Sequence, residues 1–306
     1  MIYLDHAATT PVPAEVARAV YDTLTAGWGN PSSQYPAGRQ AKAAVDAARG
    51  TIADALGCKA EEFIFTSCGS ESDNWAIRLA AHQNRRVGKH IITTAVEHSA
   101  VLNPCKALEQ EGYSVTYLNP DKNGDVAVSQ VEDALREDTA LVTMMLVNNE
   151  TGCIFPVGEV ARLLKAKGSC ALLHTDAVQG FLELPFRADT LARMAADKAY
   201  AEEKLLALDG VVRIGGGQAP HILSLSLVGY PSANVVSELG AQGICISAGS
   251  ACHRGQPSHV YRAMGLDKKT AAGVLRISFG PETTEREIDV LAEALRAHRD
   301  TRFPML

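Results

Sequence analysis

The sequence predicts an α/β fold built on a mostly parallel sheet, followed by a smaller α+β region. Through the first two thirds of the 306 residues, short apolar runs alternate with longer segments of helical periodicity. Strands that alternate with helices form βαβ units, in which helices cover both faces of a parallel sheet. Beyond Gly215 the strands follow one another more closely, so a second region is expected there.

Each element of the first region is predicted by its own apolar spacing. Helices are expected where apolar residues recur every three or four positions, over 14–26, 40–56, 71–84, 101–111, 128–136 and 157–167. Strands are expected in the short apolar runs over 62–67, 90–96, 113–118, 140–147 and 170–176.

The second region is predicted in the same way. Strands are expected over 221–227, 243–249 and 274–280, and helices over 232–242 and 285–298. We therefore expect a large α/β domain over 14–210, and a small α+β domain formed by 1–13 together with 211–306.

The composition excludes several classes of protein. Hydrophobic residues make up 46% of the chain, charged residues 21%, and the net charge is −6, which gives no general attraction to nucleic acid or anionic membranes. The N-terminus shows no secretory signal, and the longest apolar run, 140–147, is too short to span a bilayer. Seven cysteines, an odd number, favour reduced thiols and a cytoplasmic location.

Polar residues cluster where four of the predicted strands end. EFIFTS runs into CGSES, HIITTAV into EHS, MMLV into NNETG, and CALLH into TDAVQ. Ligands of open α/β sheets bind beyond the carboxyl ends of the strands. Loops are often polar, so one such exit means little, but four together predict the rim of a single pocket.

The residue types at this rim suit pyridoxal phosphate. Gly69 and Ser70 stand at the start of a helix, where backbone N–H groups and the helix dipole favour a phosphate. The imidazole of His98 could lie over a planar ring, although such a histidine is more often structural. The buried carboxylate of Asp176 could pair with a protonated ring nitrogen, or it could form an Asx turn or cap a helix.

Two further segments carry candidate chemistry. Cys252 stands in SAGSACHRG beside His253 and Arg254, an electropositive setting that favours a nucleophilic thiolate. A zinc site that also used His253 and His259 is the weaker alternative, because no second pair of ligands accompanies them. Arg276 is either an edge-strand residue whose stem packs or a buried clamp for a carboxylate.

Eight motifs in this order resemble the cysteine desulfurases, which are pyridoxal-phosphate enzymes of the class-V aminotransferase group with fold type I. They are YLDHAATTP at 3–11, GNPSS at 29–33, FTSCGSESDN at 65–74, EHSAV at 97–101, NNETG at 148–152, HTDAVQ at 174–179, SAGSAC at 247–252 and LRISFG at 275–280. The resemblance extends from residue 3 to about residue 298.

The resemblance implies a role for each candidate residue. Gly69 and Ser70 would hold the cofactor phosphate, His98 would stack on the ring and act in catalysis, and Asp176 would pair with the pyridine nitrogen. Two amides, those of Asn149 and Gln179, would contact the phenolic oxygen. The substrate carboxylate would be bound by Arg276 with help from Asn149 and Asn30. The thiolate of Cys252 would take sulfur from L-cysteine as a persulfide, release alanine, and pass the sulfur to an acceptor such as an iron–sulfur scaffold. The resemblance also implies a homodimer.

The chain departs from the family pattern at one place. Family members carry a Ser-x-His-Lys stretch after the aspartate strand, and its lysine forms the Schiff base with the cofactor; this stretch and two sheet strands are missing, with the break near 191–193. The sheet is therefore expected to be truncated. Lys198 and Lys204 lie on a predicted helix, and each is expected to pack its stem and expose its ammonium group. The alternative function is a lysine-free relative that acts as a binding or sulfur-relay protein.

Overall fold

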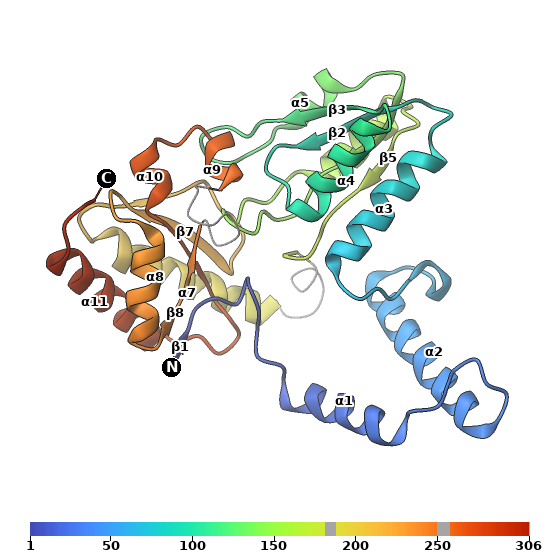
Figure 1. Cartoon of the computed structure of the whole chain (residues 1–306), viewed down its shortest axis with the longest axis horizontal. Helices are drawn as coiled ribbons and strands as arrows, with labels where there is room; N and C mark the ends of the chain where they lie inside the picture. The colour runs from blue at the N-terminus through green and yellow to red at the C-terminus, as the bar shows by residue number, and fades with distance from the viewer. Residues whose placement is uncertain (181–187, 250–257, 306) are drawn as a thin grey trace. The chain divides into compact units, whose positions relative to one another are not determined.

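The computed structural model describes residues 1–180, 188–249 and 258–305 (Figure 1). The chain divides into two compact units, one formed by Met1–Thr9 with Cys68–Leu306 and the other by Thr10–Ser67. In the described part of the chain, no helix has the length and apolar character needed to cross a membrane. The same residues contain no group of three or more His, Cys, Asp or Glu side chains placed to hold a metal ion.

The first sheet of the larger unit is parallel, as predicted. Its strand order is β3-β2-β4-β5, where the strands are β2 (His90–Thr94), β3 (Ser114–Leu118), β4 (Thr139–Thr143) and β5 (Leu172–His174). The helices α3 (Gly69–Gln83) and α4 (Ser99–Gln110) lie side by side on one face (Figure 1). Ile91 and Leu141 belong to the core under these two helices.

The opposite face of this sheet carries its own core. Ile92 and Val142, each one residue along from the side chains of the first face, pack with residues of α5 (Val128–Ala134) and α6 (Val157–Ala166). Successive side chains of a strand point to opposite faces, so a sheet that is buried on both sides has continuously apolar strands. This explains the unbroken apolar runs in the sequence.

The second sheet is antiparallel and forms the α+β region. Its order is β6-β7-β10-β9, where the strands are β6 (Val211–Arg213), β7 (Ile222–Leu227), β9 (Ser247–Ala248) and β10 (Val274–Ser278). Its core combines the apolar sides of α7 (Ala188–Leu206), α8 (Ser232–Ala241) and α11 (Glu285–Thr301) with the sheet. Two short helices, α9 (His259–Ala263) and α10 (Lys268–Ala272), lie between β9 and β10 in the chain.

The N-terminal segment joins this α+β region. Strand β1 (Ile2–Tyr3) pairs in parallel with β8 (Ile244–Cys245), and Asp5 forms an isolated bridge with Ser278 at the end of β10. The predicted strand 243–249 is therefore two short strands, because β8 pairs with β1 whereas β9 pairs with β10. The predicted boundaries of a large and a small domain remain a prediction.

The smaller unit contains α1 (Ala14–Ala26), α2 (Pro36–Leu56) and a 3-10 turn at Ala60–Glu62. The predicted strand 62–67 is wrong, since no strand lies between α2 and α3. The Phe63 carbonyl accepts a hydrogen bond from the Arg49 guanidinium instead of a strand partner, and Phe65 lies under the same guanidinium at 5.1 Å. An apolar run becomes a strand only where another strand completes its hydrogen bonds.

Candidate active site

A cavity of about 440 Å³ in the larger unit brings together most of the predicted site residues. Its lining includes Gly69, Ser70, His98, Asn149, Asp176, Gln179 and Arg276. These residues come from the start of α3, from the segments that follow parallel strands and from the antiparallel sheet, and together they line a single cavity. Cys252 and its neighbours His253 and Arg254 lie outside the described residues.

Asn30 belongs to the smaller unit, where its side-chain oxygen accepts a hydrogen bond from the Ser32 backbone N–H at 2.9 Å. Its proposed contact with substrate stays a prediction.

Residues of the larger unit form two groups at the site. We call Gly69, His98 and Asp176 the strand-end group, and Asp5, Ser247 and Arg276 the clamp group.

Asp176 follows β5 and is 8% exposed. Its Oδ1 accepts a hydrogen bond from the Val178 backbone N–H at 3.0 Å, so the Asx turn that the sequence allowed is present. Burial raises the pKa of Asp176, and the nearby Asp73 carboxylate raises it further. The carboxylate lines the cavity all the same, and a cation placed there would lower its pKa again.

Helix α3 begins at Gly69, directly beside the cavity. A Cβ on Gly69 would come within 3.0 Å of the Val178 side chain, so glycine allows the helix to start close to the turn that holds Asp176. The N-terminus of a helix presents backbone N–H groups and a partial positive charge. An anionic group of a ligand would therefore be favoured at this end of the cavity.

His98 has a structural role as well as a place in the cavity. It is the N-cap of α4, and its Nδ1 accepts a hydrogen bond from the Ala100 backbone N–H at 3.2 Å. Only Nε2 is therefore available to hold or exchange a proton with a ligand. The structural role that the sequence allowed is therefore present, and stacking of the imidazole on a ring stays a prediction.

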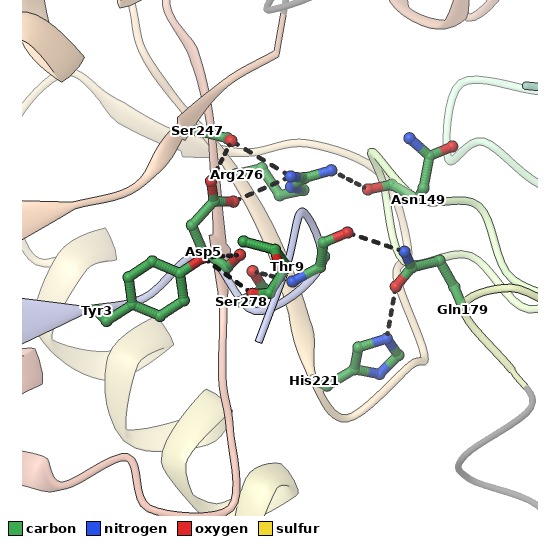
Figure 2. Close-up of polar contacts among 10 residues, drawn as sticks. Tyr3, Asp5, Thr9, Asn149, Gln179, His221, Ser247, Arg276 and Ser278 are labelled. Atoms are coloured by element: carbon green, nitrogen blue, oxygen red, sulfur yellow. Dashed lines mark hydrogen bonds and ion pairs between the residues drawn. The ribbon is translucent and has the colours of Figure 1, made fainter. Parts of the chain in front are cut away.

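Gln179 is held by two neighbours in the cavity wall (Figure 2). Its Nε2 donates to the Ala7 carbonyl at 3.0 Å, and its Oε1 lies 3.3 Å from Nε2 of His221. The side chain thus connects the strand-end group to the N-terminal segment. Its proposed contact with a phenolic oxygen would use the second N–H of Nε2, since the first donates to the Ala7 carbonyl.

Arg276 lies in β10, which is paired on both sides, so it is not an edge residue. Its Nη2 lies 3.0 Å from Oδ1 of Asp5 and 3.3 Å from the Ser247 hydroxyl, and its Nη1 donates to the Asn149 carbonyl at 2.9 Å (Figure 2). The predicted carboxylate clamp therefore holds a carboxylate of the chain itself. Asp5 was missed by the sequence analysis, although it stands inside a quoted motif.

Two glutamates with raised pKa values were also missed. Glu97, beside His98, is fully buried; its Oε1 accepts from the Thr94 hydroxyl at 2.7 Å and the Met145 N–H at 2.9 Å. Burial raises the pKa of Glu97 to about 8. Glu150, beside Asn149, accepts from the Ser258 hydroxyl at 2.7 Å, and burial raises its pKa to about 7. Their position next to candidate residues at strand exits was the available signal.

No lysine lines the cavity within the described residues. The expectation that Lys198 exposes its ammonium group is wrong, because this residue is 8% exposed and donates to the carbonyls of Gly217 and, at 2.8 Å, Ala219. The two carbonyls take the place of water as acceptors, which is what a buried ammonium group requires. Lys204 is exposed as expected, near Asp289 and over the Tyr200 ring.

Comparison with known proteins identifies relatives over nearly the whole chain. The "Cysteine desulfurase 2" of Trichormus variabilis is 36% identical, with 96% of this chain and 92% of the relative covered. The "Cysteine desulfurase IscS" of Methanosarcina thermophila is 34% identical, with 96% and 91% covered. Among solved structures, a "NIFS-LIKE PROTEIN" has a TM-score of 0.90 and 27% identity, with 98% of this chain and 100% of that chain covered. The structure described as "SspA in complex with cysteine" has a TM-score of 0.78 and 26% identity, with 93% and 100% covered.

The comparisons also locate a discontinuity. The alignment to the Trichormus protein spans 371 positions but contains 96% of 306 residues, about 294, so about 77 aligned positions carry no residue of this chain. The family model for Aminotransferase class-V matches in two pieces, residues 2–192 and 188–291, which meet close to the break predicted from sequence. Together these matches cover most of the chain, and the chain belongs to the class-V aminotransferase family.

Proposed function

We propose that this protein is a pyridoxal-phosphate-dependent cysteine desulfurase, which converts L-cysteine to L-alanine and retains the sulfur as a persulfide. One observation carries this proposal. A single cavity joins a buried carboxylate, a helix N-terminus and an imidazole on one side to an arginine on the other. The relatives named cysteine desulfurase agree with it.

The strand-end group fits the cofactor. Asp176 has a carboxylate whose pKa is raised by burial, and a pyridinium nitrogen would supply the missing positive charge. Gly69 and Ser70 would bind the phosphate through the start of α3, and His98 would lie against the ring. Bound pyridoxal phosphate supplies an electron sink that labilises bonds at the substrate carbon atoms. A cavity of about 440 Å³ has the size of a small-molecule site.

The other residues position the substrate and accept the sulfur. Arg276 and Asn149 would bind the carboxylate of L-cysteine. The thiolate of Cys252 would attack the substrate sulfur, so that an S–S bond forms as the Cβ–S bond breaks. The Cβ atom would keep the electron pair and take up a proton, leaving alanine and a persulfide. The persulfide would then pass to an acceptor protein such as an iron–sulfur scaffold. A homodimer in the cytoplasm is the expected setting.

The cofactor is expected to be held without a covalent bond to this chain. No lysine lines the described cavity, and Lys198 donates to backbone carbonyls elsewhere. The lysine of other family members also moves protons at the substrate carbon, so turnover here should be slow. In His98, Nδ1 accepts a hydrogen bond from the Ala100 backbone N–H, so Nε2 is the ring nitrogen that would carry a proton in the cavity.

The first experiment combines a mass measurement with a product assay. The protein is incubated with pyridoxal phosphate, treated with borohydride and weighed intact; we expect 32.6 kDa with no specific adduct. With L-cysteine, it should form alanine and a persulfide that is lost in Cys252→Ser. Absence of alanine above free cofactor would refute the desulfurase function. A specific adduct would instead refute non-covalent attachment, and peptide mapping would identify its lysine.

A further inference from the structure

The clamp group leaves little of Arg276 for an incoming carboxylate. Nη2 is shared between Asp5 and Ser247, and Nη1 donates to the Asn149 carbonyl (Figure 2). Only Nε is buried without a hydrogen-bond partner among the described residues. A carboxylate binds arginine best when its two oxygens accept from two N–H groups on the same edge of the guanidinium. The two edges that allow this are Nη1 with Nη2 and Nε with Nη2, so both include Nη2. A substrate carboxylate must therefore compete with Asp5 for Nη2.

Asp5 is fixed in this position by the N-terminal segment. The Leu4 carbonyl accepts from the Ser278 N–H at 2.8 Å, and the Ala7 N–H donates to the Ser278 hydroxyl at 2.8 Å, so the chain on both sides of Asp5 is bound to the end of β10. The Ser247 hydroxyl donates to Oδ2 of Asp5 at 2.8 Å. That bond can keep the Asp5 carboxylate in place when Nη2 turns to a ligand.

The pair has no net charge, which affects ligand choice. The side chains of Arg276 and Asp5 are only 11% and 18% exposed, so solvent screens them weakly. A simple carboxylate bound to Arg276 would leave two anions around one cation. A zwitterionic amino acid also carries an ammonium group, so the net charge of Arg276, Asp5 and the ligand together stays at zero. Glu150, the other carboxyl group near Arg276, has a pKa raised to about 7 and is neutral at pH 6.

We propose that Asp5 is a specificity-determining residue that makes the site prefer zwitterionic amino acids over carboxylic acids of the same shape. The inference rests on the proposed function only in taking Arg276 as the group that binds the substrate carboxylate. Asp5 acts through the charge it places beside that guanidinium. Removal of this charge relieves the competition for Nη2 and favours simple anions.

The test uses two ligands of matched shape, N,N-dimethylglycine and isovalerate. The first is a zwitterion whose tertiary amine cannot form an imine with the cofactor, and the second is an anion. Their dissociation constants are measured by ligand-observed NMR at pH 6.0, on the full chain with pyridoxal phosphate. Asp5→Asn keeps the shape of the side chain and removes its charge. We expect the zwitterion preference to fall on the order of tenfold, mainly through tighter isovalerate binding.

Three controls make the outcome decisive. Asp5→Glu keeps the charge and should keep much of the preference, whereas Asp138→Asn removes an exposed ion pair with Arg136 and should change nothing. An unchanged preference in Asp5→Asn, or an equal loss of both ligands, would overturn the proposal, because Asp5 would then only orient Arg276. Alanine formation is measured separately, so a protein that fails as a desulfurase but shows the shift still supports the role of Asp5.

Discussion

The strand-end group lines one cavity together with Ser247 and Arg276 of the clamp group, but the two groups are built in different ways. Gly69 begins α3, His98 caps α4 and Asp176 follows β5, so the position of each is encoded by a few neighbouring residues. The clamp group joins Asp5 and Arg276, which are 271 positions apart in the chain. The first group presents a carboxylate that forms no ion pair with the described residues, whereas the second neutralises its own charge.

This difference has a consequence for substitutions. A residue of the strand-end group should act mainly on cofactor binding, because the group is completed by a ligand. A residue of the clamp group should act on the choice and affinity of substrate, because its charges are already balanced within the chain.

The largest effect is expected for Asp176→Asn. The amide cannot balance a pyridinium charge, and removal of one partner of a buried ion pair costs about 3–5 kcal/mol. Affinity for pyridoxal phosphate should therefore fall by about 100-fold or more, as measured by fluorescence titration. Asp133→Asn, on the exposed side of α5, is the matched control. Wild-type affinity in Asp176→Asn would show that the strand-end group does not hold the cofactor nitrogen.

The next effect is expected for Arg276→Gln. Loss of the guanidinium removes the carboxylate clamp and leaves Asp5 without its cation, so the apparent KM for L-cysteine should rise about tenfold or more. Cofactor affinity should stay close to that of the wild type. Steady-state alanine formation and the cofactor titration measure the two effects. If the apparent KM for L-cysteine and the affinity for the cofactor changed together, the strand-end group and the clamp group would not have separate roles.

Lys198→Met tests whether the ammonium group of Lys198 contributes to cofactor binding at the strand-end group. The carbonyls of Gly217 and Ala219 would lose a donor, which should lower the free energy of unfolding by about 1–3 kcal/mol. Cofactor affinity should not change, because this ammonium group is not in the cavity lining. Urea unfolding and cofactor titration are compared with Lys204→Met, which removes an exposed ammonium group. A loss of cofactor affinity in Lys198→Met alone would identify Lys198 as the missing amine.

The sequence predicted the parallel sheet and its helices because each carries a local apolar period, and it predicted the strand-end group because polar residues mark strand exits. It was wrong about 62–67, since β-propensity says nothing of whether a partner strand is present. The clamp group could not be predicted as a pair, because long-range contacts bring Asp5 to Arg276: the pairing of β1 with β8 and the hydrogen bonds of the N-terminal segment to Ser278. The burial of Glu97 was hidden for a similar reason, as a glutamate at a polar rim has no sequence mark of full burial.

The smallest effect concerns the proton that Glu97 holds next to the strand-end group. Burial raises the pKa of Glu97 from 4.5 to about 8, so between these values the folded chain binds a proton that the unfolded chain has lost. Stability should therefore fall as pH rises from about 4.5 to about 8, by about 1 kcal/mol per pH unit from this group. Glu97→Gln keeps an amide in place of the acid and should have a flatter profile, whereas Glu137→Gln, an exposed control, should follow the wild type. Urea unfolding at pH 6 and pH 7 measures the slopes. Parallel profiles for Glu97→Gln and wild type would mean that the Glu97 carboxyl is ionised when folded, and a second negative charge would then lie near Asp176.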